Sequence, residues 1–316
     1  MSRAADVDGP WRQIGKQANA KRVYRATVSG KPVVVKRSSA AVHRRVDTGG
    51  GTLYLEILYL ETLRGEPGIP KLYGVWRDGE HIVYVVGDCG DPIGMGEPKF
   101  KVKPTILSEA FTRRAEEQPL QLARSLLVCF RSWASNGYLQ NSFKAEQFTM
   151  MNENGEIYLV DGPRMLADAP LTKAVVSAWG RVAGSSLQKR LLNLEFKHKC
   201  HADDACPSTR NIHSCKRHGA CEPGALGAPE SRGTCRDGLC MLLSEKTHVF
   251  DVANRPWLLP FIAARASGAD RDLLVTLIRR ASAENPDDRP SFAELVGLID
   301  RYEALTRDGA ISSPRR

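Results

Sequence analysis

The sequence predicts an α+β fold in which strands come first and helices follow. Residues 11–36 and 75–86 are rich in valine and aromatic side chains, and Ser-Gly and Asp-Gly pairs interrupt them, which is typical of hairpins. Residues 120–134 carry apolar side chains at helical spacing. A cysteine-rich segment of about residues 198–242 has too few apolar residues to form a core. The length of 316 residues suits one large two-lobed domain or two small ones.

Composition and charge narrow the class of protein. With 42% hydrophobic and 26% charged residues, the chain can form a sizeable core without disulfides. The net charge of +9 is spread along the chain, which favours solubility or a basic groove over nucleic-acid binding. No apolar run reaches the roughly 18 residues of a membrane span, and Met1–Pro10 lacks the apolar part of a signal peptide. Taken alone, the sequence predicts a soluble chain that is not exported, or a domain cut from a longer anchored protein.

Two charged residues in the first third of the chain fall in apolar surroundings. Lys36 ends a run of three valines, and a lysine after a buried strand needs a partner or a ligand. Glu56 lies in an expected helix, Thr52–Arg64, that is apolar almost all round and has Thr52 as a plausible N-cap. A buried carboxylate without a cation is costly, so Glu56 also needs a partner.

The stretch from residue 144 to residue 162 predicts a β-hairpin with polar residues at its open end. Its strands are Phe148–Met151 and Ile157–Val160, and Asn152–Gly155 is the turn, in which Asn-Gly supplies positive φ angles. Antiparallel pairing brings the residues before and after the hairpin together. We therefore expect convergence of three side chains, namely Lys144, Gln147 and Asp161. A cation, an amide and a carboxylate in one place can hold a phosphate and its Mg²⁺.

The order of these motifs resembles protein kinases. Lys36 matches the lysine of the third strand, Glu56 matches the glutamate of the following helix, and Asp161 matches the aspartate of Asp-Phe-Gly. Lys144 and Gln147 match the lysine and asparagine of the catalytic loop. Further along the chain, Gly87–Gly90 suits the hinge between lobes, and Asp288–Leu295 resembles the start of the closing helix, in which Arg289 usually pairs with a glutamate that is missing here.

The departures from the kinase pattern concern the chemistry. Gln140–Ser142 stand where kinases have His-Arg-Asp, and no aspartate occurs between Ile106 and Val160, so the usual catalytic base is absent. Only Gly15 of the Gly-rich loop remains, which degrades the clamp on the phosphates. Glu146 is the nearest carboxylate in the sequence to the missing base.

The kinase resemblance implies a bilobal fold that binds ATP and Mg²⁺. The divisions are a tail at 1–9, an N-lobe at 10–90, a C-lobe at 91–306 and a tail at 307–316. The nucleotide would meet Gly15, Lys36, Glu56, Gln147 and Asp161, with Asp161 and Gln147 as metal ligands. The residues implied in phosphoryl transfer are Lys144, Glu146 and Asp161.

Six of the eight cysteines crowd into one segment: Cys200, Cys206, Cys215, Cys221, Cys235 and Cys240. No C-x-x-C pair occurs, which favours three disulfides over a zinc site with nearby histidines, although both remain open. Six cysteines allow 15 connectivities, and spacing does not choose among them.

The cysteine segment, the Glu-Gln-Phe before the hairpin and the Trp257–Pro260 that follows Cys240 together point to one group. The chain is similar to a divergent protein-kinase-domain family of cysteine-rich type II membrane proteins of the endoplasmic reticulum and Golgi. That resemblance implies a disulfide-containing domain in the lumen of the secretory pathway.

Three functions follow from these patterns. The first is a nucleotide-binding, kinase-like protein that transfers phosphate to a hydroxyl of an unidentified protein. The second is a catalytically inactive pseudokinase that binds a protein partner through its C-lobe and cysteine-rich insert. The third and weakest is a zinc-dependent interaction domain.

Overall fold

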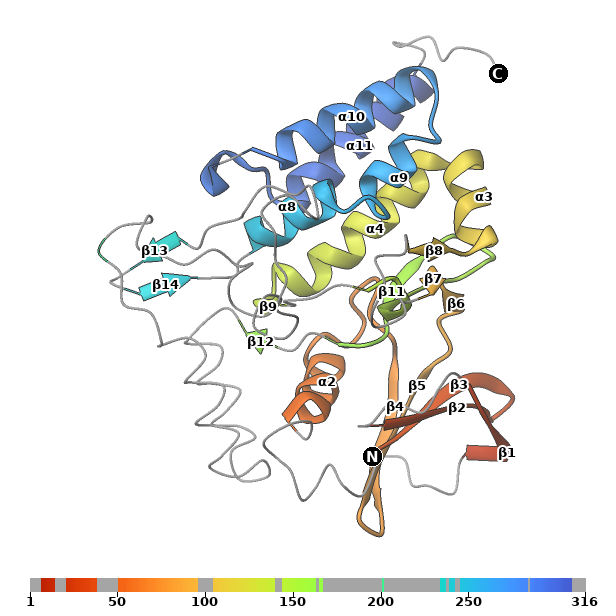
Figure 1. Ribbon diagram of the computed structural model, residues 1–316. Coiled ribbons are helices and arrows are strands. Elements are labelled where there is room, and N and C mark those ends of the chain that lie inside the picture. The colour runs from red at the N-terminus through yellow and green to blue at the C-terminus, as the bar shows by residue number, and fades with distance from the viewer. Residues whose placement is uncertain are drawn as a thin grey trace.

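The computed structural model describes residues 7–14, 21–38, 51–95, 105–139, 144–162, 165–166, 201, 234–236, 239–241, 245–283 and 285–308. These residues form an α+β structure, as the sequence predicts. A five-stranded sheet lies at one end and most of the helices lie at the other, and helix α2 stands beside the sheet (Figure 1). No helix in the described part of the chain is both long and apolar enough to cross a membrane.

The sheet is antiparallel, with the strand order β1-β2-β3-β5-β4. Its strands are β1 (Val7–Gln13), β2 (Lys21–Val28), β3 (Lys31–Ser38), β4 (Leu72–Asp78) and β5 (His81–Gly87). The turn between β2 and β3 is the predicted Ser-Gly pair, and both residues have positive φ, at 49° and 75°.

Valines of β3 and β5 alternate between the two faces of the sheet. On one face lies a small cluster that comprises Val33, Val35, Val83 and Val85, against which Trp11, Tyr24 and Trp76 pack. The other face contributes to the main core, where Tyr84 and Val86 join the side chains of α2. Lys36 is on this second face and therefore points toward α2.

Helix α2 (Gly51–Thr62) packs against the sheet and is buried from residue 56 to residue 60. The predicted helix is present, but the prediction of Thr52 as its N-cap is wrong because the helix begins one residue earlier, at Gly51.

The helical half is built around α4 (Pro119–Ala134), whose buried side chains include the predicted core residues Phe130 and Trp133. The helices around it are α3 (Glu109–Glu117), α8 (Glu245–Asn254), α9 (Leu259–Ala263), α10 (Gly268–Ala281) and α11 (Phe292–Arg307). A 3-10 turn, Pro286–Asp288, precedes α11.

Arg289 is a buried cation at the start of the last helix, with only 2% of the residue exposed. Its Nε donates to the carbonyl of Ala283 at 2.7 Å and its Nη1 to that of Lys246 at 3.2 Å. The guanidinium also lies 4.4 Å from the centre of the Phe250 ring. The sequence did not identify a partner for Arg289. In the structure its guanidinium contacts two backbone carbonyls and the face of an aromatic ring.

Short strands connect the two halves. The hairpin of β10 (Phe148–Met150) and β11 (Ile157–Leu159) pairs with β6 (Asp91–Pro92), which follows the sheet. The remaining strands form three pairs: β7 (Gly94–Met95) with β8 (Ile106–Leu107), β9 (Tyr138–Leu139) with β12 (Met165–Leu166), and β13 (Thr234–Arg236) with β14 (Leu239–Met241).

Gly90 allows the segment between β5 and β6 to lie close to the backbone of the β10–β11 hairpin. Its φ is +86°, and a Cβ built there would lie 2.1 Å from the carbonyl oxygen of Met150. Only glycine has both the backbone freedom and the small size that this position needs.

Candidate functional site

The predicted hairpin is present, and Phe148 is opposite Leu159 in its register. Its turn is the predicted Asn152–Gly155, but only Gly155 has a positive φ, of 71°. The expectation that Asn154 shares this geometry is wrong because the loop is wider than a two-residue turn. The N–H of Gly155 donates to the carbonyl of Met151 at 2.8 Å, four residues earlier, and a bond of this kind needs the left-handed conformation only at its last residue.

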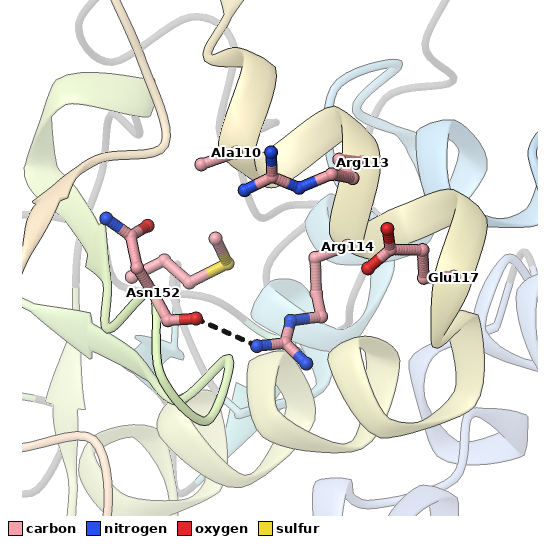
Figure 2. Close-up of a pocket in the computed structure, with 6 residues that line it drawn as sticks. Ala110, Arg113, Arg114, Glu117 and Asn152 are labelled. Carbon is pink, nitrogen blue, oxygen red and sulfur yellow. Dashed lines mark hydrogen bonds between the residues drawn. The ribbon is translucent and has the colours of Figure 1, made fainter.

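Helix α3 supports the closed end of the hairpin. The Nη2 of Arg114 donates to the carbonyl oxygen of Asn152 at 2.9 Å (Figure 2). A small hollow beside this contact is lined by Ala110, Arg113, Arg114, Glu117, Met150 and Asn152. It lies at the turn, whereas Gln147 and Asp161 flank the open end, so the hollow is a separate place from the candidate site.

The centre of the site is a buried ion pair between β3 and α2. Lys36 Nζ lies 2.5 Å from Glu56 Oε1, and each side chain is only 6% exposed. The ammonium of Lys36 also donates to the carbonyl of Val160, the residue before Asp161. Burial lowers the pKa of Lys36, and the Glu56 carboxylate only partly opposes that effect. Lys36 therefore links the sheet, the helix and the end of the hairpin.

A second lysine joins this pair, and sequence reasoning missed it. Lys21, the first residue of β2, places its Nζ 2.6 Å from Glu56 Oε2 and 2.6 Å from Asp161 Oδ1. Burial alone would lower the pKa of Lys21, but the carboxylates of Asp161 and Glu56 outweigh it and raise that pKa well above its usual value. The four charges form one cluster in which each lysine contacts Glu56.

Asp161 is the most accessible member of this cluster, with 33% of its side chain exposed. Burial would raise the pKa of Asp161, but the ammonium groups of Lys21 and Lys36 outweigh burial and lower that pKa. Gln147 Nε2 donates to Asp161 Oδ2 at 3.2 Å. The carboxylate is therefore ionised and held in place by a hydrogen bond on one oxygen and an ion pair on the other.

The three residues that the sequence places at the open end of the hairpin do not all converge. Gln147 contacts Asp161, but its Oε1 accepts from the backbone N–H of Lys144 at 2.9 Å. The ammonium of Lys144 instead lies 3.6 Å from Glu146, and the two side chains are 58% and 44% exposed. In this arrangement the amide nitrogen of Gln147 holds Asp161 in position. For Gln147 to bind a metal ion as predicted, its amide oxygen would have to break the hydrogen bond with the N–H of Lys144.

Gly162 allows α2 to lie against the site. A Cβ at this residue would be 3.1 Å from Cγ of Glu56 and 3.1 Å from a ring carbon of Tyr59. The glycine that follows Asp161 is thus explained by the close approach of the helix that carries Glu56.

Several predicted residues lie outside the described part of the chain: Gly15, Gln140–Ser142, Cys200, Cys206, Cys215 and Cys221. Cys235 and Cys240 are direct cross-strand partners in the pair β13–β14. Opposed residues of antiparallel strands have Cα atoms about 4.5–5.5 Å apart, within the range that a disulfide spans. The disulfides themselves stay a prediction.

The described residues include no cluster of three or more His, Cys, Asp or Glu side chains that could hold a metal ion. Among the carboxylates of the cluster, Asp161 is the accessible candidate metal ligand, since both oxygens of Glu56 contact lysines. This single carboxylate fits Mg²⁺ when it arrives with phosphates, because Mg²⁺ in such sites takes one or two carboxylates and otherwise phosphate and water oxygens.

Comparison with known proteins adds no family to this picture. A scan against models of protein families finds no match to the chain, and a search of curated proteins finds none either.

Proposed function

We propose that the chain is a divergent, bilobal protein-kinase-like domain that binds ATP with Mg²⁺. The observation that carries this proposal is the buried cluster in which Lys36, Glu56 and Asp161 meet from β3, α2 and the end of the hairpin. In the kinase pattern the same three residue types occur in the same chain order. The five-stranded sheet, the helix beside it and the helical half beyond a connection at Gly87–Gly90 further support the proposal.

The residues of the cluster have distinct roles in nucleotide binding. Glu56 orients Lys36, whose ammonium neutralises the α- and β-phosphates. Asp161 would hold Mg²⁺, which supplies charge neutralisation at the phosphates when bound, and Gln147 fixes the carboxylate of Asp161 by the hydrogen bond at its Oδ2. Phosphoryl transfer depends mostly on positioning and electrostatics, so this set is sufficient for weak transfer to a protein hydroxyl.

A catalytically inactive pseudokinase is the second candidate, and two observations favour it. No aspartate occurs between Ile106 and Val160 to accept the proton of a substrate hydroxyl. Glu146, the nearest carboxylate in the sequence, is exposed and paired with Lys144. In this case the helical half and the cysteine-rich segment would serve as a protein-binding surface. Assay of labelled phosphate transfer from ATP, with Asp161→Asn as the blank, separates the two candidates.

Thermal unfolding with and without Mg-ATP tests the binding proposal. Nucleotide at 100 times its Kd should stabilise the native state by about 2.7 kcal/mol, which raises the Tm by several degrees. Asp161→Asn should lose most of this shift because the variant lacks the carboxylate that would hold the metal. Asp78→Asn is the matched control, since Asp78 pairs with Arg37 at 2.8 Å on the surface of the sheet and its side chain is 54% exposed. An equal shift in all three proteins, or none in the native chain, would refute the proposal.

A further inference from the structure

Lys21 belongs to the charged cluster, but the proposed function gives this lysine no role. Its ammonium lies 2.6 Å from Asp161 Oδ1 and 2.6 Å from Glu56 Oε2, and only 17% of its side chain is exposed. The contact joins two residues that are 140 positions apart in the sequence. Lys21 therefore holds the start of β2 against the end of the hairpin, directly over the carboxylate that would receive a metal.

Lys21 supplies one of the two ammonium groups among the four charged residues of the cluster. Lys36 contacts Oε1 of Glu56, and Lys21 contacts both Oε2 of Glu56 and Oδ1 of Asp161. Two ammonium groups thus face two carboxylates. Removal of Lys21 would take one positive charge away from these two carboxylates, and a site that becomes more negative attracts cations more strongly.

Both oxygens of Asp161 have partners in this arrangement. Oδ1 has the Lys21 ammonium at 2.6 Å, and Oδ2 accepts from Gln147 at 3.2 Å. The ammonium group fills the space and cancels the charge that a divalent cation would need at Oδ1. Lys21 must therefore leave Asp161 before a cation can bind there, and phosphate oxygens would offer the ammonium a new partner.

We propose that Lys21 is a built-in blocking cation that closes the Asp161 site to divalent metal ions until a nucleotide binds. In this proposal, which rests on the proposed function, the Lys21 ammonium moves from Asp161 to the nucleotide phosphates and so frees the carboxylate. Metal and nucleotide then bind cooperatively, and each raises the affinity for the other by the same factor.

Binding of Mn²⁺ alone, without nucleotide, tests this proposal by the loss of the free-ion signal in electron paramagnetic resonance. Lys21→Met should bind Mn²⁺ about tenfold or more tightly than the native chain, because it removes a unit charge in contact with the site. Lys21→Gln keeps a polar side chain and should change in the same direction, which covers the case in which the methionine variant does not fold. Arg22→Gln is the matched control, since Arg22 is the next residue of β2, carries the same charge and is exposed.

The gain should disappear in the double variant Lys21→Met/Asp161→Asn, which identifies Asp161 as the ligand. Unchanged Mn²⁺ affinity in both Lys21 variants would overturn the proposal, as would a gain that survives the loss of Asp161 or an equal gain in Arg22→Gln. Because no nucleotide is present, this result is independent of whether the chain binds ATP, which the thermal-unfolding experiment decides.

Discussion

Glu56→Ala is expected to lower the free energy of unfolding by about 3–5 kcal/mol, because it leaves buried charge without its partner. Both carboxylate oxygens of Glu56 are engaged, one by Lys36 at 2.5 Å and the other by Lys21 at 2.6 Å. Lys36 would keep its contact with the Val160 carbonyl, and Lys21 would keep its contact with Asp161. Denaturant unfolding monitored by circular dichroism measures the change.

Glu61→Ala on the same helix is the matched control. Glu61 pairs with Arg64 at 2.7 Å, but both side chains are about half exposed, and such pairs contribute less than about 1 kcal/mol. Equal destabilisation by the two variants would show that the helix, and not the buried cluster, determines the effect.

Gly90→Ala is expected to destabilise the fold by roughly 2–5 kcal/mol, from left-handed strain together with steric displacement of a packed backbone. The new Cβ would lie 2.1 Å from the carbonyl oxygen of Met150, so the connection or the hairpin must move. Since the hairpin carries Asp161, the same variant should also weaken nucleotide binding. Thermal unfolding and an ATP titration measure the two effects.

Gly79→Ala separates strain from contact. Gly79 also has a positive φ, of 58°, but no heavy atom lies within 4 Å of a Cβ built there. This variant should cost only about 1–2 kcal/mol and leave nucleotide binding unchanged. A Gly90→Ala protein as stable as Gly79→Ala would contradict the close approach at Met150.

The sequence alone predicted those elements that depend on residues close together in the chain. The spacing of apolar residues predicts α4 around Phe130 and Trp133, and two short apolar strands on either side of the Asn152–Gly155 turn predict the β10–β11 hairpin. The apolar surroundings of Lys36 and Glu56 indicate that each needs a partner, although pairing them required the order of motifs along the chain. These features depend on residues close together in the sequence.

The remaining features depend on contacts between distant segments. Lys21 starts a strand, where a lysine usually meets solvent, and only the folded chain brings its ammonium to Asp161, 140 positions away in the sequence. The direction of the Gln147 amide depends on the 3-10 turn Ala145–Gln147, because the residue before that turn, Lys144, presents its N–H to Gln147. Arg289 has carbonyl partners in two other segments, which no motif encodes.

Isothermal titration of ATP in the presence of Mg²⁺ tests the central claim most directly, with the native chain, Lys36→Met and Lys31→Met compared side by side. Lys31 starts the same strand as Lys36 but is exposed, so its loss controls for the change in net charge. We predict one saturable site in the native chain, unchanged affinity in Lys31→Met and at least about tenfold weaker binding in Lys36→Met, which loses a charge-assisted contact to phosphate. No saturable binding in the native chain, or equal affinity in Lys36→Met, would contradict a nucleotide site at this cluster.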